Sequence, residues 1–350
     1  MISEKQIKEI REELDYCKRP LFFFHDDPDG LCSFLLLYKY TKEGKGIVIK
    51  SSPKVGVQFL PKIEEYGPDK IFILDIALVN QDFLDAVNVP VIWIDHHEPM
   101  ERIKVKYYNP RIDNPKDNTP VSYYCYQATQ RKEDMWIAIC GIVGDWFMLP
   151  LSKEFSAKYP ALLPEKVKKP EKVLFSTKLG ELIKILSFIL KGSTSEVMKC
   201  IKIMTRIEDP YEIIEQRTPR GNYIYKRAML VKKEYDIMLE DAMKAKKKDM
   251  ITYIYTEGKY SFTKELSNEL LFQNPDKIIL VCREKSGEMK CSLRSGPGII
   301  LPPILEKALK DIDGYGGGHE HACGTCVKKE DFQQFLSNLN EEIDAAGKKH

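Results

Sequence analysis

The stretch "LFFFHDDPDGLCSFLLLYKY" at residues 21–40 places one histidine and three aspartates between two apolar runs. The first run, "LFFF", is typical of a short buried strand. Similar apolar runs at residues 46–50, 70–74 and 89–94 alternate with helical patterns as far as about residue 148. This alternation predicts βαβ units, and therefore an α/β fold with a mostly parallel sheet that helices cover on both faces.

A change of composition divides the chain of 350 residues into two expected domains. Residues 150–170 carry four prolines and several lysines, which is typical of a domain boundary. We therefore predict a first domain over residues 1–150, a linker and helical connector over residues 151–224, and a smaller α/β domain over residues 225–350. Strand-like runs in the last domain lie at 250–258, 276–285 and 288–296, with helices expected at about 300–311 and 329–346.

The charge balance and the cysteines bound the classes of function. With 54 basic and 52 acidic residues the net charge is only +2, so a polyanion would need a local basic patch or metal ions. No apolar run reaches the length of a membrane span, and the N-terminus is a charged amphipathic pattern, so we expect a cytoplasmic protein with no membrane partner. The nine cysteines are expected to be reduced core thiols, because Cys32, Cys125, Cys140 and Cys200 lie in apolar segments. Ile2, Ile7, Ile10 and Leu14 fall near one face of the N-terminal helix, which we expect to pack on the core.

Acidic and histidine residues follow three of the expected strands. "HDDPDG" follows residue 24, Asp75 follows residue 74, and "DHH" at 95–97 follows residue 94. The carboxyl ends of parallel strands meet at one edge of a sheet, where such folds build their sites. Asp145 lies in "CGIVGDW", within an otherwise apolar helical segment, where an uncompensated carboxylate would be costly to bury. The sequence therefore predicts one acidic cluster at this edge.

This much negative charge predicts bound metal ions, because neighbouring carboxylates otherwise raise each other's pKa. Alternation along an extended segment would point His25, Asp27 and Asp29 the same way. The candidate ligands are His25, Asp27, Asp29, Asp75, His96 and Asp145. Six ligands suit two divalent ions with a shared carboxylate, and carboxylate and imidazole without thiolate favour Mn²⁺, with Mg²⁺, Fe²⁺ or Co²⁺ as alternatives.

Each motif also has a simpler interpretation when it is taken alone. "DPDG" is a good turn sequence, Asp75 could cap a helix, and "DHH" could be a strand-end turn with surface histidines. An EF-hand does not fit, because the register that puts Gly30 sixth puts His25 first and Leu36 where the bidentate glutamate belongs. Five of the six histidines fall in "HDDPDG", "DHH" and "GGHEH", which favours a site over coincidence.

Taken together, "HDDPDG", "LDIA", "IDHH" and "GDW" resemble the four metal-binding motifs of the DHH phosphoesterase superfamily. "CSLRSG" at 291–296 and "GYGGGHEHACG" at 314–324 are similar to the arginine strand and the GGGH signature of the DHH-associated domain in RecJ-like exonucleases and nanoRNases. The resemblance covers roughly residues 20–150 and 225–345.

The resemblance implies a role for each matching residue. His25, Asp27 and Asp75 would hold one ion, and Asp29, Asp75, His96 and Asp145 the other. His97 would face the scissile phosphate as a catalytic residue, and Asp95 would orient a histidine. In the second domain, the substrate would be bound by Arg294, Gly316, Gly317, Gly318 and His319, with the glycine N–H groups forming an anion nest. His319, His321, Cys323 and Cys326 are also spaced so that they could chelate zinc.

The function expected from the resemblance is a metal-dependent single-strand exonuclease that acts on DNA or RNA in repair or replication. Tyr107, Tyr108, Tyr123 and Tyr124 could stack on bases or could simply pack. The chain stops shortly after the glycine motif, like the shorter archaeal exonucleases and nanoRNases, which favours 3′→5′ polarity. The alternatives are an oligonucleotide or cyclic-dinucleotide phosphodiesterase and a non-catalytic replication scaffold. A helicase or replication partner and a homo-oligomer are further expectations.

Overall fold

The computed structural model describes residues 1–50, 54–245, 250–256 and 258–347, which form two compact units. The first unit spans Met1–Met229 and the second Leu230–His350. The helices of residues 151–214, which the sequence predicts as a connector, belong to the first unit. The predicted strand at 250–258 includes residue 257, which lies outside the described residues. None of the described helices is long and apolar enough to cross a membrane.

The first unit is built on a parallel five-stranded sheet of order β2-β1-β4-β6-β7, as the sequence predicts. Its strands are β1 (Pro20–His25), β2 (Lys45–Ile49), β4 (Lys70–Leu74), β6 (Val91–Ile94) and β7 (Lys106–Tyr108). A separate pair of parallel strands consists of β3 (Lys54–Val55) and β5 (Leu78–Val79). Because β1 pairs in parallel with both β2 and β4, the end of β1 lies between the ends of these two strands at the carboxyl edge.

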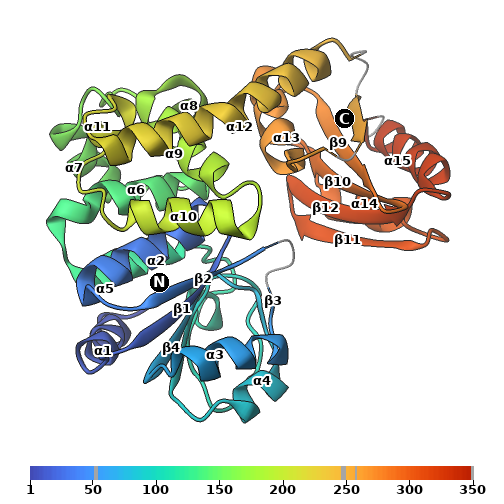
Figure 1. The fold of residues 1–350 in the computed structure, drawn as a ribbon. Coiled ribbons are helices and arrows are strands. Elements are labelled where there is room, and N and C mark those ends of the chain that lie inside the picture. The colour runs from blue at the N-terminus through green and yellow to red at the C-terminus, as the bar shows by residue number, and fades with distance from the viewer. Residues whose placement is uncertain (51–53, 246–249, 257, 348–350) are drawn as a thin grey trace. The chain divides into compact units, whose positions relative to one another are not determined.

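Helices cover both faces of this sheet, as Figure 1 shows. One face carries α1 (Glu4–Asp15), α2 (Pro28–Thr41) and α5 (Val121–Thr129), and the other carries α3 (Leu60–Tyr66) and α4 (Gln81–Ala86). Strand β1 contributes side chains to the core on both faces of the sheet, because successive side chains of a strand point to opposite faces. Phe24 stacks on Phe34 of α2 with ring centroids 4.6 Å apart, while Phe23 meets the ring of Phe83 in α4.

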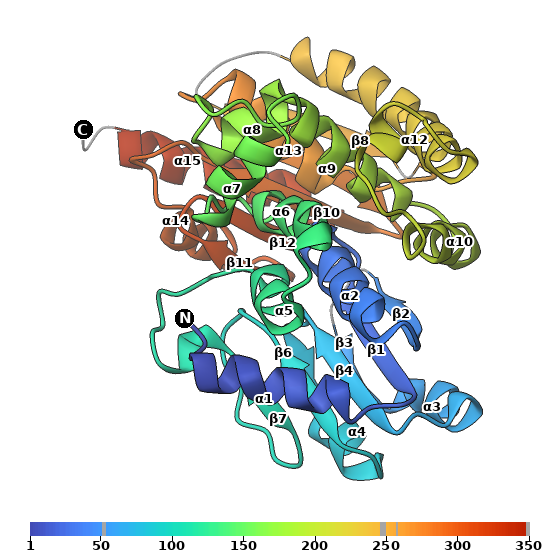
Figure 2. The same cartoon turned by 90° about the vertical axis from the view of Figure 1, so that its left-hand side faces the viewer.

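The N-terminal helix α1 docks on α5, as its apolar stripe predicts. Ile10 and Leu14 are buried, and a capping box of Ser3 and Gln6 begins the helix. The Arg11 side chain donates hydrogen bonds to the Ala128 and Gln127 carbonyls, at 2.6 and 3.3 Å. Figure 2 shows α1 lying along the sheet below α5.

Beyond α2, a second layer of helices completes the first unit (Figure 1). Its members are α6 (Met135–Gly144), α7 (Leu151–Lys158), α8 (Pro170–Ser176), α9 (Lys178–Ile189), α10 (Thr194–Met204), α11 (Tyr211–Ile214) and the first part of α12 (Pro219–Met243). Helix α6 is buried on all sides, since it packs on α2, α5 and α9. The sequence places Asp145 inside this helix, but α6 ends at Gly144 and Asp145 is its C-cap residue.

The second unit is a mixed sheet of order β11-β12-β10-β9-β8. Its strands are β8 (Met250–Thr256), β9 (Ile278–Lys285), β10 (Glu288–Arg294), β11 (Gly314–His319) and β12 (Ala322–Lys328). Helices α14 (Leu301–Ala308) and α15 (Phe332–Gly347) pack on one face, and α13 (Thr263–Gln273) packs against β9 and β10. The sequence predicts β8, β9 and β10 but not β11 and β12, whose glycine-rich composition is poor for a strand.

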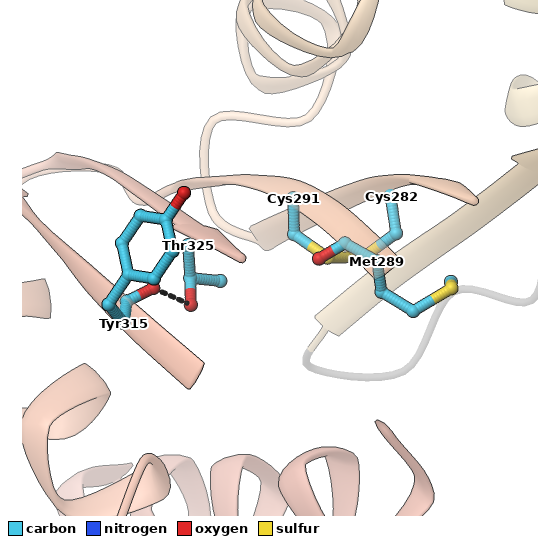
Figure 3. The surroundings of a disulfide bond; sticks show 5 residues. All are labelled: Cys282, Met289, Cys291, Tyr315 and Thr325. Carbon is cyan, nitrogen blue, oxygen red and sulfur yellow. Dashed lines mark hydrogen bonds between the residues drawn. A yellow bond between two sulfur atoms is a disulfide. The ribbon is translucent and has the colours of Figure 1, made fainter. Parts of the chain in front are cut away.

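One pair of cysteines contradicts the prediction of reduced thiols. Cys282 of β9 and Cys291 of β10 lie directly opposite each other and form a disulfide. Figure 3 shows this bond between the two strands, with Met289 beside it. Cys32, Cys125, Cys140 and Cys200 are free and buried, as predicted. The sequence could not show the pair because the register of β9 on β10, which brings the two residues together, depends on the tertiary fold.

Phe34 is the aromatic side chain that joins α2 to β1, and we expect Phe34→Ala to destabilise the first unit strongly. Phe34 is buried, stacks on Phe24 and meets Phe22 edge to face. Truncation of such a ring costs about 3–5 kcal/mol of unfolding free energy through the cavity that it leaves. Urea denaturation measures the loss. Tyr16→Ala, at a ring that is 80% exposed, is the control and should change the unfolding free energy by less than about 0.5 kcal/mol.

Candidate metal centre

Three neighbouring strands bring their polar ends to one edge of the first sheet. His25 is the last residue of β1, Asp75 directly follows β4, and Asp95, His96 and His97 follow β6. The register aligns these ends, because Leu74 pairs with both Phe24 and Ile94. The cluster predicted from the strand ends therefore exists in the fold.

The first group of candidate ligands consists of His25, Asp27 and Asp75. The Nδ1 atom of His25 lies 3.1 Å from Asp27 Oδ2 and 3.4 Å from Asp75 Oδ2. Asp27 is also the N-cap of α2, where its other oxygen accepts from the Gly30 N–H. Gly30 is needed here, because a Cβ at this position would lie 2.5 Å from the His25 carbonyl oxygen. The helix can therefore begin close enough to β1 to bring Asp27 beside His25.

Asp75 adopts a backbone conformation that is uncommon for a residue with a side chain. Its φ is +56°, in the left-handed region, and its N–H donates to the Ile94 carbonyl at 3.0 Å. Aspartate tolerates this region better than most residues, at a cost on the order of 1–3 kcal/mol. Strain of this kind persists where the surrounding structure fixes it, and here it turns a fully buried carboxylate toward both neighbouring strands.

The second group consists of Asp29, His96 and Asp145. The Nδ1 atom of His96 lies 3.7 Å from Asp145 Oδ2, and its Nε2 atom lies 3.2 Å from Asp75 Oδ1. Asp75 therefore touches both groups, one oxygen toward His25 and the other toward His96. All six predicted ligands are brought together, and the shared position of Asp75 is the one that the resemblance implies.

The N-terminus of α5 holds Asp29, a contact that the sequence analysis missed. The backbone N–H groups of Val121 and Ser122 donate to the Asp29 carboxylate at 2.8 and 3.0 Å, and the Ser122 hydroxyl also donates to it. The first N–H groups of a helix have no partner within the helix, so they favour an anion here. The threonine-proline start of this helix was visible in the sequence, but its proximity to Asp29 was not.

Burial and charge perturb the proton affinities of the cluster. Burial alone would lower the pKa of His25, but Asp27 and Asp75 hold it well above its ordinary value. Burial alone would also lower the pKa of His96, but Asp145 and Asp75 hold it well above its ordinary value. For Asp29, burial and then the charges of Asp75 and Asp145 raise the pKa to about 8. The positive charge of the protonated histidines thus partly neutralises the negative charge of the carboxylates in this cluster.

The donor set fits divalent cations. Two atoms in the centre of the cluster, His25 Nδ1 and Asp75 Oδ2, are buried 3.4 Å apart, and neither makes a hydrogen bond of good geometry among the described residues, although Asp27 Oδ2 lies 3.1 Å from His25 Nδ1. A buried polar atom without a hydrogen bond is costly, and a cation between these two atoms would remove that cost. Oxygen and imidazole ligands without thiolate suit Mn²⁺, and Mg²⁺ when oxygen predominates.

His97 lies beside these groups and is oriented by Asp95. Its Nδ1 atom is 2.7 Å from Asp95 Oδ1 and 3.9 Å from Asp75 Oδ1. Burial lowers the pKa of His97, but the hydrogen bond and charge of Asp95 more than offset this and raise it. The His97 side chain is 33% exposed, so its Nε2 atom can reach a ligand.

Two further residues fix this histidine, and sequence reasoning missed their role. Asn109 donates to the His97 carbonyl at 3.0 Å and to the Tyr107 hydroxyl at 2.7 Å. Tyr107 stacks on Trp93, with ring centroids 3.9 Å apart, and its hydroxyl lies 3.5 Å from Asp95 Oδ2. Tyr107 therefore packs one face of its ring on Trp93 and is only partly buried.

Of the other candidate stacking tyrosines, Tyr108 and Tyr124 pack in the core. Tyr124 is fully buried, and Tyr108 is buried with its hydroxyl donating to Glu9 at 3.3 Å. Only Tyr123 of the four is partly exposed without such an anchor for its hydroxyl among the described contacts.

The predicted substrate residue Arg294 ends β10 in the second unit. Its guanidinium donates to the Asn268 side chain at 2.7 Å and to the carbonyls of Leu293 and Cys323 at 2.9 and 3.2 Å. Burial lowers its pKa to about 10. Three neutral acceptors fix the guanidinium in place.

Gly316, Gly317 and Gly318 lie in β11 and not in the predicted nest. The strand is extended, pairs with β12 and forms one edge of the sheet, and all its residues including His319 are exposed. Gly318, at φ +152°, allows close approach, since a Cβ there would lie 2.3 Å from the Ala322 carbonyl oxygen. The glycines were expected to form an anion nest, but pairing with β12 makes this segment an extended strand.

The possible zinc ligands of this region are not gathered. Cys323 and Cys326 are three residues apart on β12, so their side chains point to opposite faces of the sheet. His321 Nδ1 instead lies 3.0 Å from the Ile299 carbonyl oxygen. Among the described residues, the candidate metal groups all lie in the first unit.

Comparison with known families and structures agrees with this architecture. Residues 21–149 match the N-terminal domain of the DHH family, and residues 250–345 match the DHHA1 domain. The chain therefore carries a DHH domain and a DHHA1 domain. A search of curated proteins finds no match to the chain.

Solved structures with the same fold cover nearly the whole chain. RecJ of Thermus thermophilus in complex with Mn²⁺ matches with a TM-score of 0.71 at 18% identity, over 98% of this chain and 54% of that one. An exonuclease RecJ bound to manganese matches at 0.63 and 14% identity, over 98% and 95%. A pGpG-specific phosphodiesterase from Vibrio cholerae matches at 0.51 and 14% identity, over 94% and 100%. The chain thus spans about half of the Thermus RecJ.

We expect metal binding to release protons and to strengthen as pH rises. His25 and His96 have raised pKa values, so they keep protons at a pH where a free imidazole is neutral, and a metal ion must displace them. Titration calorimetry with Mn²⁺ in buffers of different ionisation enthalpy, between about pH 6 and pH 8, measures the release. His96→Gln should release fewer protons and the control His321→Gln as many as the unmodified protein. Binding without proton release would contradict the expectation.

Proposed function

We propose that this protein is a phosphoesterase that hydrolyses the phosphodiester bonds of single-stranded nucleic acid and acts as a metal-dependent exonuclease. The observation that carries the proposal is the pair of ligand groups joined by Asp75, which belongs to the first group and contacts His96 of the second, with the Asp95–His97 pair beside them. Two cation sites around one bridging carboxylate are typical of phosphoester hydrolysis.

The residues of the first unit have distinct tasks in this proposal. His25, Asp27 and Asp75 would hold one divalent ion, and Asp29, Asp75, His96 and Asp145 the second, with Mn²⁺ preferred and Mg²⁺ or Co²⁺ as alternatives. Bound there, the ions supply positive charge for the phosphoryl oxygens and acidify the attacking water. The helix N-terminus behind Asp29 keeps that carboxylate turned toward the second ion site.

His97 is placed to stabilise charge on the scissile phosphate. Its Nδ1–H is fixed by Asp95 at 2.7 Å, so Nε2 is the ring nitrogen that would contact a substrate. With the raised pKa, Nε2 carries a proton over more of the neutral range and can donate it to a phosphoryl oxygen. Asn109 and Tyr107 keep the pair in place and are positioning residues.

Nucleic acid as the substrate is supported by the second unit and by the related structures. Arg294 presents a fixed guanidinium, and the exposed glycine strand offers backbone that a phosphodiester chain can approach closely. Two RecJ structures share the fold over 98% of this chain. We propose 3′→5′ polarity, a cytoplasmic role in repair or replication, and a helicase or replication protein as partner.

A second candidate is a phosphodiesterase for dinucleotides or very short oligonucleotides. The pGpG-specific phosphodiesterase has this fold over its whole length, which supports it. A scaffold without activity is disfavoured, because all six ligands and the Asp95–His97 pair are in place.

One experiment separates these functions. Oligonucleotides of two and about twenty residues, of DNA and of RNA, are labelled at either end and incubated with Mn²⁺ or with a chelator. A ladder that shortens from one end supports the exonuclease and gives its polarity. Cleavage of the dinucleotides alone supports the second candidate, and no metal-dependent cleavage overturns both.

Asp75→Ala is expected to abolish hydrolysis and leave the protein folded. The change removes the carboxylate that both ion sites share, while it also relieves a crowded acidic cluster. Product formation falls below detection, and the circular dichroism spectrum stays that of the unmodified protein. Glu64→Ala, at an exposed acid of α3, is the matched control and should keep full activity.

His97→Gln is expected to lower kcat by about 10²–10⁴-fold, in the range of a positioned proton donor. Its effect on KM should be small, and its effect on Mn²⁺ affinity should be smaller than that of His96→Gln, because Asp95 engages the Nδ1 atom that His97 would offer beside Asp75 and His96. Steady-state kinetics and Mn²⁺ titration give the two parameters. A rise in KM with an unchanged kcat would show that His97 binds substrate without acting on the phosphate.

A further inference from the structure

A surface cavity of the first unit lies next to the Asp95–His97 pair, and the proposed function gives it no task. Its volume is about 830 Å³, which is within the range of binding sites for small molecules. Two of its lining residues adjoin the pair: Glu98 directly follows His97, and the Tyr107 hydroxyl lies 3.5 Å from Asp95 Oδ2. A ligand in this cavity would therefore lie beside the residues that contact the phosphate in the proposed function.

Hydrogen bonds fasten the loop that follows β6, which forms part of the cavity. The Gln81 side chain accepts from the Ile103 N–H at 3.1 Å and donates to the Ile103 carbonyl at 3.3 Å. The Arg102 Nε–H donates to the Val79 carbonyl at 2.6 Å. Gln81, Arg102 and Ile103 all line the cavity, so its shape is held before any ligand binds.

Arg111, in the short 3-10 helix Pro110–Ile112, brings unused donors to the cavity. Its backbone N–H donates to Asn109 Oδ1 at 2.8 Å, and the Asn109 amide donates to the His97 carbonyl at 3.0 Å, which ties Arg111 to His97. The guanidinium forms an ion pair with Glu98 through Nη2, while Nε has no hydrogen-bond partner among the described residues. Glu98 is 80% exposed, so the ion pair is weak and both groups can share a ligand.

The charge balance of the cavity disfavours a phosphate as its occupant. The charged residues that line it are two cations, Arg102 and Arg111, and two anions, Glu98 and Glu101. The carboxylates of Asp95 and of the metal centre add further negative charge nearby. A second phosphate would gain no net attraction here, so the cavity suits a neutral group.

Much of the remaining lining is apolar. Met100, Ile103 and Ile112 belong to it, and Ile103 and Ile112 are 66% and 56% exposed. Two exposed isoleucines at one cavity leave apolar surface that a ligand can cover. A nucleobase needs apolar surface for its flat faces and hydrogen-bond partners for its edge, and this cavity offers both.

We propose that this cavity binds the base of a nucleotide next to the scissile phosphate, with guanine preferred, and that Arg111 is the residue that recognises it. The inference rests on the proposed function and narrows its substrate class. Guanine presents two neighbouring acceptors, O6 and N7, which match the fork of an arginine. Its amino group can donate to Glu98. Adenine offers Arg111 only one acceptor on the same edge, N7.

The kinetic test varies the base and the arginine together. Trinucleotides carry guanine, adenine or no base on either side of the cleaved linkage in turn, and they are compared for the unmodified protein and Arg111→Ala. On one side, loss of guanine should lower kcat/KM of the unmodified protein by about tenfold or more, the usual effect of losing a bidentate base contact. Arg111→Ala should lose this factor with guanine and little with the abasic substrate. Arg111→Lys, which keeps the charge but not the fork, should restore little of the preference.

A binding test keeps this inference separate from the proposed function. Saturation-transfer NMR with guanosine, which carries no phosphate, is carried out in chelator and needs neither metal ions nor hydrolysis. Arg111→Ala and Ile112→Ser should each reduce the guanosine signal severalfold, and adenosine should give a weaker signal with the unmodified protein. Arg206→Ala, at an exposed arginine beyond the end of α10, is the matched control and should keep the guanosine signal.

Each outcome supports or overturns the base subsite. If Arg111→Ala lowers kcat/KM equally for guanine, adenine and abasic trinucleotides, or leaves the guanosine signal unchanged, the subsite does not exist and Arg111 is structural. If guanosine binds as stated but no oligonucleotide is cleaved, the proposed function fails while the subsite stands. If oligonucleotides are cleaved at the same rate whatever the base and guanosine does not bind, the proposed function stands without the subsite. Thermal denaturation shows that each variant is folded, and Ile112→Ser tests the cavity at an exposed side chain.

Discussion

Repulsion between carboxylates at one edge of a sheet is the constraint on which this molecule depends. Parallel pairing brings the ends of β1, β4 and β6 together, so every acid placed at those ends must face the others. Two features of the fold reduce this repulsion. The N–H groups at the start of α5 donate hydrogen bonds to Asp29, and the raised pKa values of His25 and His96 keep these histidines protonated and positively charged. Divalent cations would reduce the repulsion further, since they replace those protons with a larger positive charge.

The apolar scaffold makes this crowding tolerable. Strand β1 is buried on both faces by aromatic residues, with Phe24 packed on Phe34 of α2 and Phe23 on Phe83 of α4. Packing of this kind stabilises the strand by far more than the strain at Asp75 costs. The close approach at Gly30 then sets the distance between α2 and the strand end, so the position of Asp27 follows from packing and not from the metal site itself.

Sequence patterns predicted four of the five strands of the first sheet, all but β7, and the six candidate ligands, because both depend on local order. Apolar runs define the strands, and an acid just after a strand of a parallel sheet can only lie at its carboxyl edge. The partners of those ligands were not predictable in this way. Ser122 reaches Asp29 across 93 positions of the chain, and Asn109 contacts His97 through a loop whose path no local pattern encodes.

In the second unit, too, a local sequence pattern could not predict a structure that depends on distant residues. Glycine is unfavourable in strands, so "GYGGGH" was not predicted to be a strand, yet it pairs along its full length with β12. The pairing partner, "ACGTCVK", supplies the β-forming residues, and its alternate side chains Cys323 and Val327 enter the core beneath α14 and α15. A strand can therefore be imposed by its neighbour. Because Cys323 and Cys326 both lie in strand β12, three positions apart, their side chains point to opposite faces of the sheet. The CxxC spacing, which is typical of zinc ligands, therefore does not bring these two thiols together.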